Sequence, residues 1–415
     1  MFISYYAFYP KFRHYVTDGK GILNTNWRDV LEAWTLLPER RLNPNSFIPY
    51  LIVDREQISP SAFILTVEPR RFCKNWNTIS VNRGTVQKPL ENGLWCVEIK
   101  QPQLQVARDY TPLPVPVGLD EEKIQDDIVW GRLRFLIRKM EGGEVSSYLS
   151  KLQVGDRVEL RGPHLGFNVA ERLGLERTDS EVVFLAGGTG IAPALQVARR
   201  LYGPVYAQPI GLLGKFAKVE DTSMPAAPPK MTIVWANRNR EDCPDCEEVE
   251  ALRKRGYLPP AVSVVDATKT GGIMSYLQDV KAHNPEHFNF VCTVDAEKKF
   301  IDANAILDAV ASTKTSKSSA LTAANVADPS CPLHSSFALV NVSDRQDHEA
   351  KCQCPSHAVG KNLLMVSGPE GFVAKFAGAK AWSEGLERQG NVGGVVAELM
   401  KKGKLNGQDW MVLKL

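Results

Sequence analysis

The sequence has no long hydrophobic run, few cysteines and almost no net charge. No stretch approaches the roughly 18 uncharged apolar residues of a membrane-crossing helix, and the apolar, aromatic residues 1–10 lack the charged start of a secretory signal. Eight cysteines among 415 residues are too few for a disulfide-built scaffold. A net charge of +3 is too small to indicate a nucleic-acid partner. These absences predict a globular protein without internal repeats.

The composition is 44% hydrophobic and 23% charged, and the length fits two or three domains. Residues 1–45 form an irregular N-terminal extension with at most one short amphipathic helix, at 24–36. Short β-rich runs separated by turn signals then predict a closed antiparallel barrel. The expected strands are 50–54, 62–68, 93–101, 132–139 and 157–161.

Farther along the chain, apolar strands alternate with helical segments, which predicts a parallel sheet with crossover helices. The expected strands are 182–186, 231–236, 261–266 and 363–367, and the expected helices are 194–202, 248–256 and 273–281. Two insertions interrupt this pattern, at 205–230 and at about 312–360. The second is rich in small and polar residues, so we expect a disordered or loosely attached surface segment.

The most informative stretch joins an apolar run, Val182–Ala186, to the glycine turn Gly187–Gly190 and then to Pro193. The run is typical of a strand buried on both faces of a parallel sheet. Glycines let the backbone approach a ligand closely, and Pro193 is tolerated in a first helical turn. A helix start directs N–H groups and a positive dipole end toward an anion, most simply a pyrophosphate. A structural turn without a ligand is the alternative for this stretch alone.

Two motifs in the barrel region carry related chemistry. In the first, Arg108 offers a fork of donors for a phosphate, Tyr110 a flat ring for stacking, and Thr111 a hydroxyl for a ring nitrogen. In the second, Arg138–Leu149, a glycine turn follows basic residues, and Ser146 is the expected N-cap of a helix that begins at an anion site. The alternatives are an edge strand with a turn and a capped helix without a ligand.

A third motif, Met365–Phe372, runs from an expected strand into Gly368-Pro369 at the carboxyl edge of the sheet, where open α/β sheets bind ligands. In this order the motifs resemble the ferredoxin–NADP reductase superfamily, most closely its cytochrome b5 reductase branch, over roughly residues 46–415 apart from the insertions. The resemblance implies an α+β two-domain fold. A six-stranded antiparallel β-barrel flavin domain at 46–172 is followed by a parallel α/β nicotinamide-binding domain at 178–415.

The resemblance also implies FAD as the cofactor and NADH or NADPH as the electron donor, with hydride passed to the flavin and electrons then passed singly to an acceptor. The implied FAD-binding residues are Arg108, Tyr110, Thr111, Pro112, Gly143, Val145 and Ser146. The implied pyridine-nucleotide residues are Gly187, Gly188, Thr189, Gly190, Pro193, Gly368 and Pro369. The implied catalytic residues are Thr111 and Ser367.

Ser367 departs from the pattern that it resembles. Relatives usually carry a cysteine before the Gly-Pro pair, near the site of hydride transfer. Serine keeps a small polar group there, so we expect slower hydride transfer rather than none.

A narrower resemblance, to the fungal mitochondrial cytochrome c import factors, rests on 45–50, 366–372, 393–395, 410–415 and the serine-rich insertion. It implies a flavoprotein of the mitochondrial inner membrane that faces the intermembrane space. Its implied partners are cytochrome c haem lyase and apocytochrome c or haem, whose iron it reduces before attachment. Neither a presequence nor a span is evident ahead of the barrel, which leaves two alternatives: the sequence starts late, or this member is associated with the membrane peripherally. The alternatives are a cytochrome b5 reductase-like diaphorase and a weakly active flavin-binding assembly factor for haem lyase.

The cysteines give no metal site. Cys243-Pro244-Asp245-Cys246 is interpreted as a turn after the second strand of the parallel sheet, with a redox dithiol as the alternative. A Cys/His-rich tract at 331–357 matches no zinc spacing and is assigned to the insertion, with metal or haem binding as the alternative.

The coenzyme preference stays open. Arg238 and Arg240 follow the second strand of the parallel sheet, where an arginine favours the 2′-phosphate of NADPH. Asp242 lies at the same place and could instead hold a ribose hydroxyl.

Overall fold

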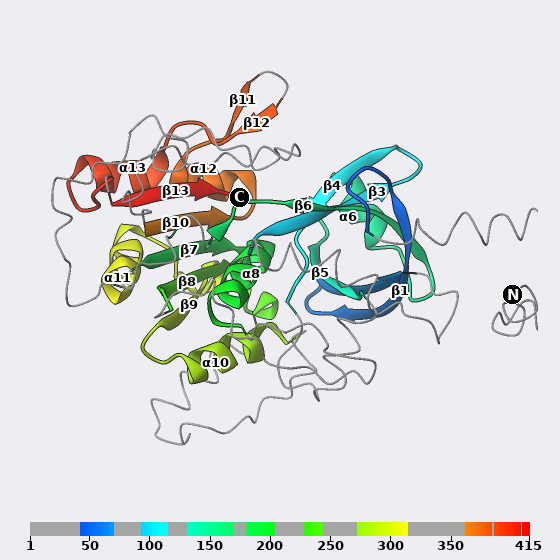
Figure 1. Ribbon diagram of the computed structural model, residues 1–415, viewed down its shortest axis with the longest axis horizontal. Helices are drawn as coiled ribbons and strands as arrows, with labels where there is room; N and C mark the ends of the chain where they lie inside the picture. Colours follow the sequence, from blue (N-terminus) through cyan, green and yellow to red (C-terminus); the bar gives the residue numbers. More distant parts are fainter. Residues whose placement is uncertain are drawn as a thin grey trace, which may run out of the picture.

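The computed structural model describes residues 42–69, 93–114, 131–169, 173, 180–203, 228–243, 272–313, 362–383, 386–407 and 409–415. Two sheets lie in two units beside each other (Figure 1), the first antiparallel and the second parallel. The helices expected at 24–36 and 248–256, the strand expected at 261–266 and almost all of both insertions lie outside the described residues. The domain boundary expected between 172 and 178 stays a prediction for the same reason.

The first unit is a six-stranded antiparallel sheet with the order β4-β3-β6-β1-β2-β5. Its elements are β1 Ile48–Gln57, β2 Ala62–Pro69, β3 Trp95–Gln101, β4 Val106–Tyr110, β5 Leu133–Arg138, helix α6 Glu144–Leu149 and β6 Arg157–Leu165. Every strand expected here is confirmed. After β4 the chain runs next to β5, where the Leu113 N–H donates a hydrogen bond to the Arg134 carbonyl at 2.7 Å. Alternate residues such as Val97 and Ile99 fill the interior.

The second unit is a five-stranded parallel sheet with the order β13-β10-β7-β8-β9. Its strands are β7 Glu181–Gly187, β8 Lys230–Asn237, β9 Phe288–Val294, β10 Asn362–Ser367 and β13 Trp410–Lys414. Its helices are α8 Ile191–Tyr202, α10 Ile273–His283, α11 Ala303–Thr313, α12 Glu370–Ala377 and α13 Gly394–Lys401. Short 3-10 turns lie at η2 Gly188–Gly190, η3 Arg240–Asp242 and η5 Asp295–Glu297. The sequence did not predict β9, β13, α11, α12 or α13.

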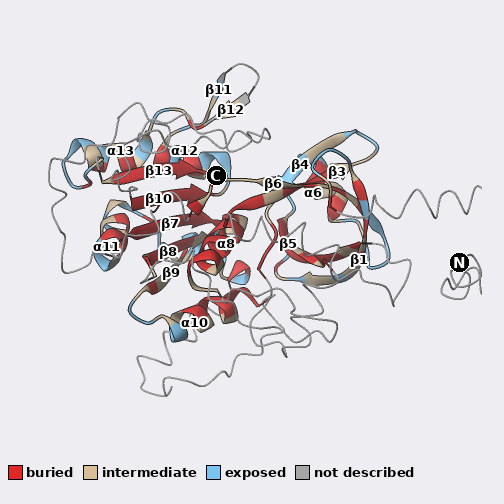
Figure 2. Ribbon diagram, viewed as in Figure 1, coloured by how far each residue is buried: buried red, intermediate tan, exposed pale blue. Residues whose placement is uncertain are grey.

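Both faces of this sheet are covered, as the uninterrupted burial of β7 requires (Figure 2). Val182 and Phe184 point to one face, which α8 and α10 cover. Val183 and Leu185 point to the other face, which α11, α12 and α13 cover. Because side chains alternate along a strand, one apolar run supplies both cores.

The two units share one core across their junction. Barrel residues Leu94, Leu113 and Leu136 belong to the same buried cluster as α8. Within it, the Gln196 side chain of α8 accepts a hydrogen bond from the Trp95 N–H at 3.0 Å and donates to the Pro112 carbonyl at 2.8 Å. Helix α8 is therefore fixed to the barrel by apolar packing and by two buried polar contacts.

The C-terminal strand anchors a small hairpin, β11 Ala381–Ser383 with β12 Leu386–Arg388. Lys414 is 1% exposed, and its Nζ donates to the Ala379 and Asn391 carbonyls, each at 2.8 Å. Burial lowers the pKa of Lys414 to about 8. Its two acceptors flank the hairpin, so this one side chain fixes both ends of it. Among the described residues, every helix is too short or too polar to cross a membrane.

We expect Gln196→Leu to lower the free energy of unfolding by about 2–4 kcal/mol, because the buried Trp95 N–H and Pro112 carbonyl both lose their partner. Denaturant unfolding measures this change, with Gln103→Leu on the exposed β3–β4 connection as the matched control. Equal stability of the two variants would contradict the role of Gln196 at the junction.

Candidate functional site

The site lies at the carboxyl edge of the parallel sheet, where the strand order reverses. From β7 the chain proceeds to β8 on one side and later returns to β10 on the other. A crevice forms at such a point in open α/β sheets. The turn after β7 and the turn after β10 meet there: a Cβ at Gly190 would lie 2.3 Å from the Ser367 carbonyl oxygen.

The three glycines of the β7–α8 turn have different surroundings. A Cβ at Gly187 would lie 2.9 Å from the Phe372 ring, and one at Gly190 would overlap the Ser367 backbone, so both positions need glycine for packing. Gly188 has φ +54°, and the nearest atom to its added Cβ is Arg138 Nη1 at 3.7 Å. Of the three, only Gly188 leaves room above the turn for a ligand.

The remaining predicted nucleotide residues border the same turn. Thr189 is half-buried within η2, and Pro193 is buried in the first turn of α8. Ser367 ends β10 and is 5% exposed. Gly368 has φ +153° and packs against Gly187, and the exposed Pro369 is the N-cap residue of α12.

The first barrel motif lies along β4 and just after it. The half-buried Tyr110 ring contacts Phe135 edge-on at 6.4 Å between centroids. Burial raises the pKa of Tyr110 to about 12, against a lowering effect of Arg108. Arg108 Nη2 is 3.7 Å from Glu144 Oε2, which links β4 to the start of α6. Thr111 is half-buried, whereas Pro112 is buried and bonded to α8.

The second motif corrects one expectation. Ser146 is not the N-cap of its helix, because α6 begins at Glu144 and its N-cap residue is Gly143. The Ser146 hydroxyl instead accepts the Met140 N–H at 3.1 Å and donates to the Gly143 carbonyl at 3.3 Å. A side chain three residues into the helix thus holds the preceding turn. The Val145 side chain is buried in the barrel core.

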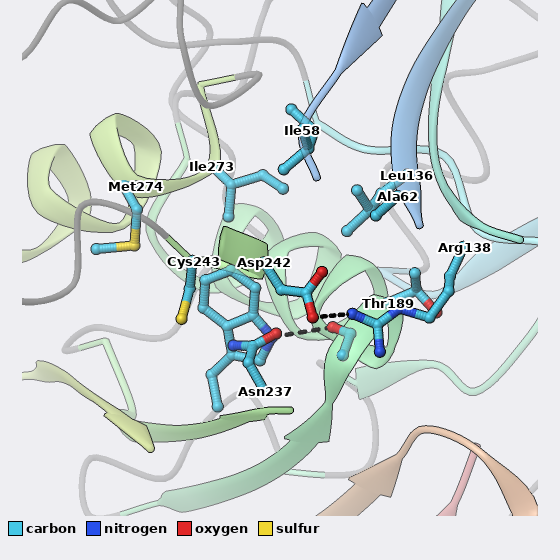
Figure 3. A pocket seen from close by; sticks show the side chains of 12 residues that line it. Ile58, Ala62, Leu136, Arg138, Thr189, Asn237, Asp242, Cys243, Ile273 and Met274 are labelled. Carbon is cyan, nitrogen blue, oxygen red and sulfur yellow. Dashed lines mark hydrogen bonds and ion pairs between the residues drawn. The ribbon is translucent and has the colours of Figure 1, made fainter. Parts of the chain in front are cut away.

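A pocket lies between the barrel and the second unit, the parallel sheet with its helices, which is called the nucleotide unit below (Figure 3). The barrel contributes Ile58, Ala62, Leu136 and Arg138, and the parallel sheet and its turns contribute Gly188, Thr189, Trp235, Asn237, Asp242, Cys243, Ile273 and Met274. Its walls are mostly apolar, with a few polar groups near Gly188.

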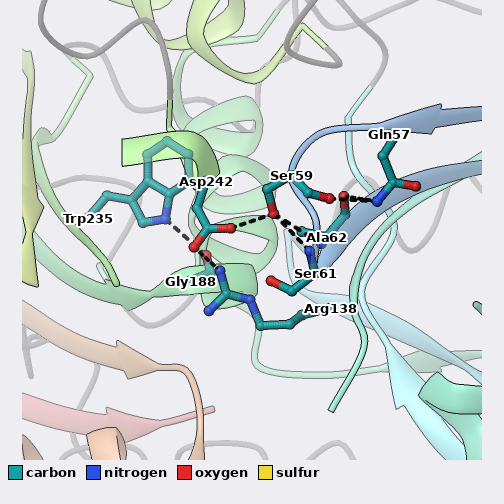
Figure 4. Close-up of polar contacts among 8 residues, drawn as sticks. All are labelled: Gln57, Ser59, Ser61, Ala62, Arg138, Gly188, Trp235 and Asp242. Carbon is teal, nitrogen blue, oxygen red and sulfur yellow. Dashed lines mark hydrogen bonds and ion pairs between the residues drawn. The ribbon is translucent and has the colours of Figure 1, made fainter. Parts of the chain in front are cut away.

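An ion pair crosses this pocket (Figures 3 and 4). Arg138, at the end of β5, pairs through Nη2 with Asp242 Oδ2 in η3. Asp242 Oδ1 accepts a hydrogen bond from Ser59 Oγ at 2.7 Å. Beside them, Trp235 Nε1 donates to the Gly188 carbonyl at 2.9 Å and fixes the glycine turn.

No individual role was predicted from the sequence for Arg138, Ser59 or Trp235. Arg138 lies in a quoted motif, but only the fold brings it to Gly188. Asp242 was expected to be a candidate for a ribose hydroxyl, and the structure shows it bound to Arg138 and Ser59 instead.

The other coenzyme candidates are also engaged or exposed. Arg240 forms a two-bond fork with Glu297, with distances of 2.7 and 2.5 Å. The Arg240 guanidinium lowers the pKa of Glu297. Arg238 is exposed. Burial raises the pKa of the Cys243 thiol to about 11, and Cys246 of the same motif lies outside the described residues, as does the tract at 331–357.

Two family models match the chain. Residues 94–168 match the oxidoreductase FAD-binding domain, and residues 184–299 match the oxidoreductase NAD-binding domain. These matches fall on the barrel and on the parallel sheet respectively.

Three curated relatives are similar to part of the chain. The chain is 32% identical over 191 residues to the cytochrome c mitochondrial import factor CYC2 of Saccharomyces cerevisiae, covering 38% of this chain and 50% of that protein. It is 30% identical over 165 residues to an uncharacterized FAD-binding protein of Schizosaccharomyces pombe, covering 40% and 50%. It is 27% identical over 154 residues to NADH-cytochrome b5 reductase 1 of Kluyveromyces lactis, covering 36% and 41%.

The chain spans about half the length of these relatives or less. The two domain matches, their order and the two-sheet architecture nevertheless agree with one another. The chain is a flavin oxidoreductase with an FAD-binding domain followed by an NAD-binding domain, and it is similar to the NADH-cytochrome b5 reductases.

Proposed function

We propose that this protein is an FAD-dependent NAD(P)H oxidoreductase that passes electrons to ferric haem during haem attachment to cytochrome c in mitochondria. One observation carries the redox part of the proposal. The open turn at Gly188 and the Tyr110–Pro112 segment of the barrel are held at one junction, because α8 begins at the turn and bonds to Pro112. Hydride transfer between two bound cofactors requires two neighbouring binding sites.

The barrel residues fit FAD. The exposed 3.7 Å pair of Arg108 with Glu144 contributes little to stability, so a phosphate can displace it. Half-buried Tyr110 rests on the barrel core and still offers surface to a flat ring. Gly142 has φ +73° and no atom within 4 Å of an added Cβ, which leaves the backbone before Gly143 open.

The parallel sheet fits a pyridine nucleotide. Gly188 opens toward the pocket, and the α8 start directs its N–H groups and dipole there. Thr189, Ser367, Gly368 and Pro369 border the turn and are the groups proposed to hold the nicotinamide end. FAD, when bound, supplies hydride acceptance and one-electron release, and the protein supplies orientation and exclusion of water. Ser367, at 5% exposure, is proposed to position the donor rather than to move a proton.

The haem acceptor and the location rest on the yeast relative. That protein is named as a mitochondrial import factor for cytochrome c. By this likeness we propose a mitochondrial location at the inner membrane facing the intermembrane space, with cytochrome c haem lyase and apocytochrome c as partners. A second candidate acceptor is cytochrome b5, which the likeness to NADH-cytochrome b5 reductase 1 favours.

The purified full chain tests the proposal directly. We expect a yellow protein that releases FAD and whose flavin absorbance bleaches anaerobically with NADH or NADPH. Steady-state NAD(P)H oxidation with ferric haem should exceed that with cytochrome b5 under the same conditions. A colourless protein that takes up no added FAD would end the redox proposal, and faster reduction of cytochrome b5 would replace the acceptor.

The rate of flavin reduction should rise in Ser367→Cys. A thiol restores the group that relatives usually carry, and each tenfold gain corresponds to about 1.4 kcal/mol in the barrier. Single-turnover stopped-flow absorbance measures the rate, with Ser367→Ala as the control that keeps the space but supplies no thiol. An unchanged rate in the cysteine variant would argue against this role for Ser367.

Alanine at the two glycines of the turn should separate packing from binding. Gly190→Ala forces a Cβ into the Ser367 carbonyl, so we expect a loss of about 1–3 kcal/mol or more in stability. Gly188→Ala meets open space, and its positive φ costs only about 1–2 kcal/mol, but we expect much weaker NAD(P)+ binding. Thermal unfolding and calorimetric titration measure both. Intact coenzyme affinity in folded Gly188→Ala would exclude this turn as the binding site.

A further inference from the structure

The ion pair across the interdomain pocket is largely buried and joins the two units. The Arg138 side chain is 17% exposed and that of Asp242 is 5% exposed. Each comes from a different unit, since Arg138 ends β5 of the barrel and Asp242 lies in η3 after β8. Ser59, from the β1–β2 turn of the barrel, also bonds to Asp242 and is 6% exposed. A carboxylate of the nucleotide unit is thus held by two barrel groups.

The guanidinium also lies beside Gly188, the open glycine of the β7–α8 turn. Arg138 Nη1 is 3.7 Å from the position that a Cβ on Gly188 would take, and the next nearest atom, Cζ of the same guanidinium, is 3.9 Å from it. Arg138 Nε is buried and has no hydrogen-bond partner within the part of the chain that the structure describes. The cation therefore has one unused donor, Nε, while its Nη1 lies next to the turn where a diphosphate is proposed to bind.

We propose that Asp242 is an internal competitor for the phosphates of the pyridine nucleotide. In the coenzyme-free protein its carboxylate neutralises Arg138, and coenzyme binding transfers the guanidinium from Asp242 to the diphosphate. The inference rests on the proposed function, because it concerns the same pocket. It assigns Asp242 a role opposite to that of a ribose ligand: its charge weakens coenzyme binding.

The Asp242 charge weakens coenzyme binding because it stabilises the coenzyme-free protein and not the complex with the coenzyme. A buried guanidinium requires an anionic partner, and here Asp242 supplies it before the coenzyme arrives. Breaking that contact is part of the cost of binding, and the carboxylate then remains beside a diphosphate of the same sign. Asp242→Asn removes both effects while its amide oxygen still accepts the Ser59 hydrogen bond. The substitution therefore destabilises the coenzyme-free protein but not the complex, so the affinity for the coenzyme increases.

The experiment is calorimetric titration of the FAD-loaded full chain with NAD+ and NADP+, which bind without turnover. We expect Asp242→Asn to bind at least one of them about tenfold more tightly than wild type, because the competing ion pair with Arg138 is lost. Inorganic pyrophosphate should compete more effectively in the variant as well. Glu241→Gln, an exposed neighbour with the same change of charge, is the control and should match wild type.

A second variant separates competition from a structural role. Arg138→Gln should weaken binding of both coenzymes and should abolish the gain when combined with Asp242→Asn. If Asp242 only braces the two units, Asp242→Asn will lower the melting temperature and bind coenzyme equally or more weakly, which overturns the inference. If wild type itself binds neither NAD+ nor NADP+, the proposed function fails first, and the two failures are therefore distinguishable.

Discussion

The close approach of two backbone turns is the constraint on which the site depends. The β7–α8 turn can touch the β10–α12 turn only because Gly190 has no side chain to place against the Ser367 carbonyl. That contact determines where α8 begins and which glycine stays uncovered. With Gly187 beneath Phe372 and Gly190 against Ser367, the turn leaves its opening at Gly188, toward the barrel. A packing requirement between two strands thus produces the space that a ligand needs.

Helix α8 carries this constraint to the barrel. Its first residues follow the glycine turn, and Gln196 near its middle bonds to Trp95 and Pro112. An α-helix is rigid over one or two turns, so the distance from the glycine turn to the Thr111–Pro112 segment is set within a single element. Catalysis by orientation tolerates little error in position. A helix that belongs to both the nucleotide turn and the domain junction meets this demand better than a flexible linker.

The local pattern of apolar and turn residues was sufficient to predict those helices and strands that a single segment of the sequence specifies. The run Val182–Ala186 and the strands of the barrel are apolar enough to be predicted, and the glycine turn indicates the nucleotide unit. Features that depend on distant partners were missed. The edge strand β9 has mixed burial and no strong alternation. Ser146 holds a turn rather than capping its helix. The Asp242 carboxylate pairs with Arg138, which lies more than a hundred residues away in the sequence. No periodicity encodes such pairs, because they arise only when the two units dock.

The charges beside the crevice share one property that governs binding of any anionic cofactor. Arg108, Arg138 and Arg240 each already face a carboxylate: Glu144, Asp242 and Glu297 respectively. Binding of a phosphate group therefore requires the arginine to exchange its carboxylate for the phosphate. The affinity for the phosphate depends on how buried the original ion pair is. The exposed pair of Arg108 yields at little cost, whereas the buried pair of Arg138 resists. Under the proposed assignment of Arg108 to FAD and Arg138 to the coenzyme, this difference gives a firmly held flavin and a readily exchanged coenzyme, which is the combination that a turnover cycle needs.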